Sequence, residues 1–112
     1  MSLAQRRSKR FKLSQLIPVA VDIGTQRILG VAVDISATGI LVRCDDALPM
    51  GAIVRLAVGR GTESVRTMAV ARRLIQGVGV GFEFRNISMT NRAFLNRLLL
   101  RLSRESITGI HV

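Results

Sequence analysis

The sequence contains no tryptophan or tyrosine, and only one histidine and one cysteine in 112 residues. A single cysteine, Cys44, excludes an intrachain disulfide and a cysteine zinc cage, and its place in an apolar stretch is typical of a small buried hydrophobe. The single histidine, His111, lies one residue from the C-terminus. Ser-His and Cys-His nucleophile pairs and histidine metal clusters are therefore not credible, and we predict no metal site.

Acidic residues are scarce too, with 7 Asp and Glu against 17 Lys and Arg. Asp45 and Asp46 are adjacent in an expected loop, and no second acidic cluster exists to pair with them in acid-base catalysis. The glycines at 77, 79 and 81 lie inside a strand pattern and lack the Lys-Ser/Thr ending of a phosphate-binding loop. We predict that the protein is not an enzyme.

Long apolar runs are absent as well. Hydrophobic residues make up 48% of the chain, but no uncharged apolar run approaches the ~20 residues that span a bilayer. The basic N-terminal segment lacks the apolar region and the cleavage site of a secretory signal. We therefore expect a cytoplasmic domain without membrane insertion.

The positive charge is the strongest compositional signal. The net charge is +10, and lysine occurs only at Lys9 and Lys12, so the other 15 of the 17 basic residues are arginines. The planar guanidinium pairs bidentately with phosphate or with a guanine edge, and it stacks on rings. This composition indicates an anionic partner, and it leaves a nucleotide, nucleic acid and an acidic membrane surface all open.

Hydrophobic periodicity predicts mainly β structure. Alternation typical of short strands occurs over residues 17–23, 28–34, 40–44, 53–58, 64–75 and 78–84. In the first of these stretches Val19 and Val21 share the expected core face, and in the second Leu29, Val31 and Val33 do. Six strands at this spacing, followed by one helix, predict a six-stranded antiparallel β-barrel with the helix packed against an opening or a side.

The helix is expected from Ser88 onward, where the period changes. Its apolar stripe consists of Ile87, Phe94, Leu95, Leu98, Leu99 and Leu102. Ser88 or Thr90 is expected to cap its N-terminus, and Leu100 lies off the stripe. The expected organisation is a flexible basic N-terminal arm over residues 1–15, the barrel and helix over 16–105, and a tail over 106–112.

Residues 34–39 join two apolar runs and place a carboxylate, a hydroxyl and a glycine close together. A strand that ends in Asp34 and Ser36 and turns back at Gly39 presents acceptors and backbone amides at one rim of a sheet. That rim can hold a polar ligand. The alternative is that Asp34 and Ser36 only stabilise the turn, because their side chains readily bond to nearby backbone N–H groups.

Together with Arg6 and Arg10 on the arm, this turn resembles the paired signature of the PilZ domain family. The motifs are Arg6-x-x-x-Arg10 and Asp34-x-Ser36-x-x-Gly39, and every motif position is in place. The Gly-Val-Gly-Phe pattern of residues 79–82, the six strands and the closing helix also look like a PilZ barrel. The resemblance implies a receptor for cyclic di-GMP (c-di-GMP) that uses no catalytic cofactor.

The resemblance also implies roles for the motif residues. Arg6 and Arg10 would pair with guanine edges or phosphates, with Arg7 as an auxiliary. Asp34 would accept from guanine or orient an arginine, and Ser36 would bond a phosphate or base. Gly39 would permit a tight turn close to the ligand.

The signal would be relayed by ordering of the arm on the rim of the barrel. The recipient would be a protein partner or a covalently linked effector domain, with motility or exopolysaccharide secretion as processes common in the family. Two other functions stay open: a basic nucleic-acid-binding β-barrel, and a PilZ-fold protein-interaction module without ligand. Against nucleic acid, Phe82 and Phe84 share the expected core face and leave no evident stacking platform.

Overall fold

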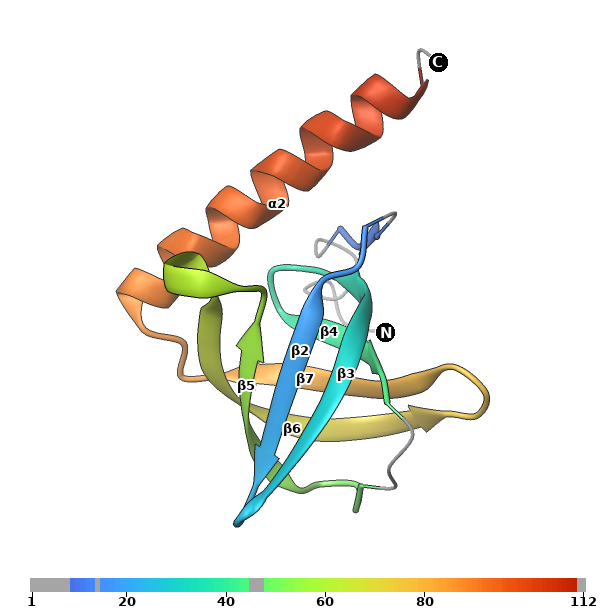
Figure 1. Ribbon diagram of the computed structural model, residues 1–112, viewed down its shortest axis with the longest axis vertical. Coiled ribbons are helices and arrows are strands. Elements are labelled where there is room, and N and C mark those ends of the chain that lie inside the picture. Colours follow the sequence, from blue (N-terminus) through green and yellow to red (C-terminus); the bar gives the residue numbers. More distant parts are fainter. Residues whose placement is uncertain (1–8, 14, 45–47, 111–112) are drawn as a thin grey trace.

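The computed structural model describes residues 9–13, 15–44 and 48–110. Its strands are β1 (Phe11–Lys12), β2 (Pro18–Ile23), β3 (Gln26–Ile35), β4 (Gly39–Arg43), β5 (Ile53–Val58), β6 (Val65–Ile75) and β7 (Gly79–Arg85), and its helices are the short 3-10 helix η1 (Gly61–Glu63) and the α-helix α2 (Met89–Ile110). Figure 1 shows the strands curving around a common axis, with α2 beginning at one end of the barrel and extending beyond that end.

Six of the strands close into an antiparallel barrel. The sheet order is β1-β3-β2-β5-β6-β7-β4, and a further pairing of β3 with β4 completes the circle of β2 to β7. The predicted fold is thereby confirmed. The expected strand over residues 53–58 matches β5, and the other five agree with β2, β3, β4, β6 and β7 to within two residues at each end.

Strand β1 lies outside this circle, in the segment for which we expected no regular structure. Phe11 pairs with Ile35 and Lys12 with Asp34, and the Leu13 amide donates to the Val33 carbonyl at 3.2 Å. The pairing of β2 with β3 ends at Pro18 and Val31, so the last residues of β3 need other backbone partners on that edge. The arm supplies them.

A tight hairpin turn joins β2 to β3. Gly24 begins its turn with φ 58, a backbone conformation that favours glycine. Next to the turn Asp22 is opposite Arg27, and two hydrogen bonds of 2.7 and 2.9 Å join their side chains. The hydrogen bond from Arg27 lowers the pKa of the Asp22 carboxyl below its usual value.

The core face of β3 differs from the prediction. Ile28 and Ala32 are buried with 2% and 4% exposure, whereas Leu29 is 74% exposed. Both faces of this stretch are apolar, so alternation alone could not choose between them. The register decides, because Val21 points into the core and its partner across the ladder is Ile28; residues directly opposite each other share a face.

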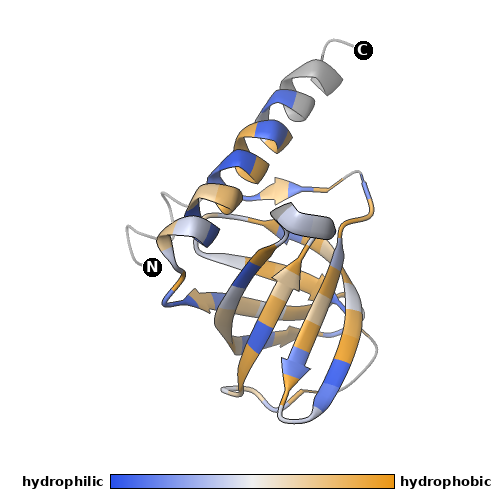
Figure 2. Cartoon of the chain, turned by 60° about the vertical axis from the view of Figure 1, so that its left-hand side comes forward, coloured by the Kyte–Doolittle hydropathy of each residue, from blue (hydrophilic) through white to orange (hydrophobic). Residues whose placement is uncertain are grey.

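Helix α2 follows the predicted stripe. Leu95, Leu98 and Leu102 are buried against the barrel, and Leu100 is 54% exposed. Ser88 is the cap, since its Oγ accepts from the Asn91 amide at 3.1 Å. Figure 2 shows hydrophilic residues alternating with hydrophobic ones along this helix. Accordingly, no helix within the described residues is long and apolar enough to cross a membrane.

Candidate functional site

A β-bulge aims Asp34 at the outer surface of the barrel. Ala32 pairs with Val42, but the next pair toward the turn is Asp34 with Leu41, so β3 carries one extra residue between them. Without that residue Asp34 would share the inward face of Ala32. The bulge moves Ile35 into the core, where it is fully buried, and turns the carboxylate outward.

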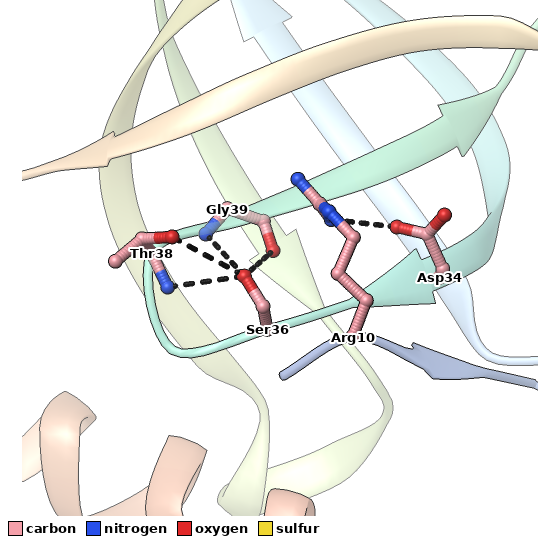
Figure 3. Close-up of polar contacts among 5 residues, drawn as sticks. All are labelled: Arg10, Asp34, Ser36, Thr38 and Gly39. Atoms are coloured by element: carbon pink, nitrogen blue, oxygen red, sulfur yellow. Dashed lines mark hydrogen bonds and ion pairs between the residues drawn. The ribbon is translucent and has the colours of Figure 1, made fainter. Parts of the chain in front are cut away.

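Arg10 meets Asp34 directly. Its Nη1 lies 2.6 Å from Asp34 Oδ1, and the two side chains are 42% and 19% exposed. Figure 3 shows Arg10 reaching from the start of β1 to the carboxylate at the end of β3. The antiparallel pairing of Lys12 with Asp34 brings Arg10, the second arginine of the arm motif, beside the carboxylate. A guanidinium has five N–H donors, so Arg10 can bind a further acceptor while Asp34 holds its orientation.

Ser36 lies inside the turn rather than on its surface. It has no exposed area, and its Oγ accepts from the Thr38 and Gly39 amides, each at 3.2 Å. Its own amide donates to the Gly39 carbonyl at 2.9 Å. Figure 3 shows the bonds made by the hydroxyl. Ser36 thus stabilises the turn, which was the alternative interpretation of the sequence. A contact of Ser36 with a ligand stays a prediction.

Gly39 is required because the backbones of the paired strands β4 and β7 lie very close together at this position. It pairs with Glu83, and a Cβ atom at this position would overlap the carbonyl oxygen of Phe82. A backbone atom of a paired strand cannot move aside as a flexible side chain can. The structure thus gives Gly39 a packing role in barrel closure, which is distinct from the tight turn expected from the sequence.

We expect Gly39→Ala to lower the free energy of unfolding by about 1 to 3 kcal/mol, the usual cost of overpacking. The matched control is Gly81→Ala, whose added methyl would lie 3.3 Å from Arg73 Cγ, the middle of a long side chain that can shift. Urea unfolding of both variants measures the difference. Equal losses would show that the approach of β4 to β7 does not require glycine at position 39.

Arg92 joins the turn to helix α2, a contact that the sequence did not predict. Its Nη1 donates to the Ala37 carbonyl at 2.7 Å. The next carbonyl, of Thr38, accepts from the Phe84 amide of β7 at 2.9 Å. The turn is therefore held from the helix and from the barrel at once. No local signal marks Arg92, because it is one of four arginines in α2 and nothing near it in the sequence identifies Ala37 as its partner.

Arg6 and Arg7 lie outside the described residues, so their proposed contacts stay predictions. The described part of the chain contains no group of three or more His, Cys, Asp or Glu residues that could hold a metal ion.

Comparison with known proteins decides the family. The PilZ domain model matches residues 4–101, which include both motifs and every strand. The chain belongs to the PilZ domain family. No curated protein matches the sequence.

Solved structures share this PilZ fold. YcgR from Escherichia coli in complex with c-di-GMP superposes with a TM-score of 0.79 at 18% identity, over 96% of this chain and 50% of that one. The PilZ domain of YcgR with c-di-GMP gives 0.74 at 19% identity, over 96% and 98%. MotI/DgrA, an inhibitor of motility from Bacillus subtilis, gives 0.70 at 22% identity, over 93% and 52%. This PilZ domain thus spans about half the length of YcgR and MotI.

Proposed function

We propose that this PilZ domain is a receptor for c-di-GMP, bound by Arg6 and Arg10 on the outer surface beside Asp34. The observation that carries the proposal is the 2.6 Å contact between Arg10 and Asp34, because it joins one residue of the arm motif to one residue of the turn motif. Two of the superposed structures, both of YcgR, contain c-di-GMP.

The chemistry of the pair suits a cyclic guanine dinucleotide. Its guanines present O6 and N7 as adjacent acceptors, and an arginine binds both at once. Asp34 holds the Arg10 guanidinium in one orientation, which reduces the ordering cost of binding. Arg6 and Arg7 supply further positive charge for the two phosphates. Ser36 contributes by fixing the turn that follows Asp34, and Gly39 by letting β4 lie close to β7.

Phosphate and guanine recognition needs no catalytic group, and we propose a receptor rather than an enzyme. We place it in the cytoplasm, where it would act on a protein partner or an attached effector domain. Motility is the first process to test, since MotI is described as an inhibitor of motility. Exopolysaccharide secretion is the second.

Binding of nucleic acid is disfavoured by the aromatic residues. Phe82 and Phe84 are 3% and 8% exposed, so neither offers a face on which bases could stack. The other two phenylalanines, Phe11 and Phe94, are partly buried, and a cation lies over each ring. Affinity for RNA or DNA would then depend mainly on the basic surface, and such binding weakens steeply with salt.

We further propose that the ligand signals by ordering the arm and that Arg92 carries the change to α2. The ligand would hold the arm through Arg10 and so extend the pairing of β1 along β3. Any shift of the turn at residues 36–39 would reach the first turn of the helix through the bond from Arg92 to Ala37. A helix terminus tied to the turn is a route by which a partner could sense the ligand.

Hydrogen exchange with saturating c-di-GMP tests this relay. We expect the ligand to slow exchange at the amides of residues 9–13 and 34–39 and to change the exchange rate at residues 89–93. The Arg92→Gln variant should still bind c-di-GMP but should show no change at residues 89–93. The C-terminal half of α2 serves as the internal control and should change little. If the arm exchanges equally slowly without ligand, the site is preformed and the relay is wrong.

A further inference from the structure

A second candidate binding site lies between α2 and the barrel. A cavity of about 360 Å³ is bounded by the segment that leads into β2, by the end of β5 and by α2. Its apolar wall includes Leu16, Phe94 and Leu98, and three arginines line it: Arg60, Arg97 and Arg101. None of the described motif residues is among its lining residues, so it is separate from the site at Asp34.

The charge of this cavity has one sign. Within the described part of the chain its lining residues include three guanidinium groups and no carboxylate. Arg97 and Arg101 are one helical turn apart, and Arg60 comes from the barrel. Arg97 is oriented by Phe94, since its guanidinium carbon lies 5.0 Å from the centre of the ring. Like charges from two elements around one cavity favour an anion between them.

The rest of the cavity wall is apolar, and part of it is exposed to solvent. Leu16 is 79% exposed, and Leu98 reaches the cavity from the buried stripe of α2. An inorganic anion would leave this wall in contact with water, whereas a hydrocarbon without charge would gain no charge attraction from Arg60 and Arg101. Only a molecule with both features uses the whole cavity.

We propose that this cavity binds a small amphiphilic anion, with a carboxylate or phosphate head group at Arg60 and Arg101 and a hydrocarbon body against Leu16, Phe94 and Leu98. The volume is at the lower end of the range for small-molecule sites. The ligand would bridge the barrel and α2 and is additional to c-di-GMP. The proposal does not depend on the motif residues.

Titration of the full chain with sodium hexanoate at constant ionic strength, followed by amide NMR, tests the proposal. The comparison ligands are 1-hexanol, hexylammonium and acetate, which lack the charge, reverse it or lack the hydrocarbon. We expect saturable changes at Leu16, Val58 and Leu98 with hexanoate. Dissociation constants should be at least about fivefold weaker with each comparison ligand, because 1-hexanol and hexylammonium lose the charge contact and acetate loses the buried hydrocarbon.

Variants locate the binding site. Arg60→Gln and Arg101→Gln should each weaken the binding of hexanoate about fivefold. Arg104 is the next arginine along the same helix and is not a lining residue, so Arg104→Gln should leave the affinity for hexanoate unchanged. All three should bind c-di-GMP as the unmodified chain does, so a failure here is distinct from a failure of the proposed receptor function. Equal binding of hexanoate and 1-hexanol, an equal effect of Arg104→Gln, or changes spread over the whole surface would overturn the proposal.

Discussion

Replacing Leu95 by alanine is expected to lower the free energy of unfolding by about 2 to 5 kcal/mol. Leu95 has no exposed area in the core shared by α2 and the barrel, so the substitution removes buried methyl groups and leaves a cavity. The loss is large beside the 5 to 15 kcal/mol typical of a whole domain. Urea unfolding, followed by far-ultraviolet circular dichroism, measures it.

The matched control is Leu100→Ala, five residues further along the same helix. Leu100 is 54% exposed, and we expect its truncation to change the unfolding free energy by less than about 0.5 kcal/mol. If Leu95→Ala cost less than about 1 kcal/mol, or no more than Leu100→Ala, α2 would not be packed on the barrel as the structure has it.

Replacing Arg10 by alanine is expected to weaken c-di-GMP binding by about 1 to 3 kcal/mol, the value of one bidentate contact to guanine. The fold should be nearly unaffected, because the pair with Asp34 is 42% and 19% exposed and such pairs contribute at most about 1 kcal/mol to stability. Calorimetric titration gives the affinity, and a thermal melt without ligand gives the stability.

Lys12→Ala is the control for charge. Lys12 lies on β1 opposite Asp34 and its loss lowers the net charge by the same amount, but it is not a motif residue. A selective effect of Arg10→Ala indicates a specific clamp. Equal weakening by both variants would mean that the arm attracts the ligand only through its overall charge.

The barrel could be predicted because each strand carries enough apolar alternation to mark its limits, as residues 53–58 do for β5. The face of β3 could not, because Ile28 and Leu29 are both large and apolar. What distinguishes them is the pairing of Ile28 with Val21, a contact between strands. The bulge that turns Asp34 outward has no marker in the sequence either, since it is a property of how β3 and β4 pair.

The candidate site, too, could be predicted from the sequence only in part. Arg10 and Asp34 were named from the motif resemblance, and the structure places them in contact. The reason for glycine at position 39 lies in Phe82, 43 residues further along the chain, and no local pattern contains it. The same holds for Arg92 and Ala37, because a hydrogen bond to a backbone carbonyl places no constraint on the type of the accepting residue.

Side-by-side calorimetric titrations with c-di-GMP and with a short single-stranded RNA, at physiological salt, test the receptor function most directly. A cyclic dinucleotide receptor should bind c-di-GMP saturably with micromolar or tighter affinity, and should bind RNA far more weakly, because charge attraction alone is screened at that salt. No heat and no thermal stabilisation with c-di-GMP, beside clear binding of RNA, would contradict the receptor function and favour a nucleic-acid-binding barrel.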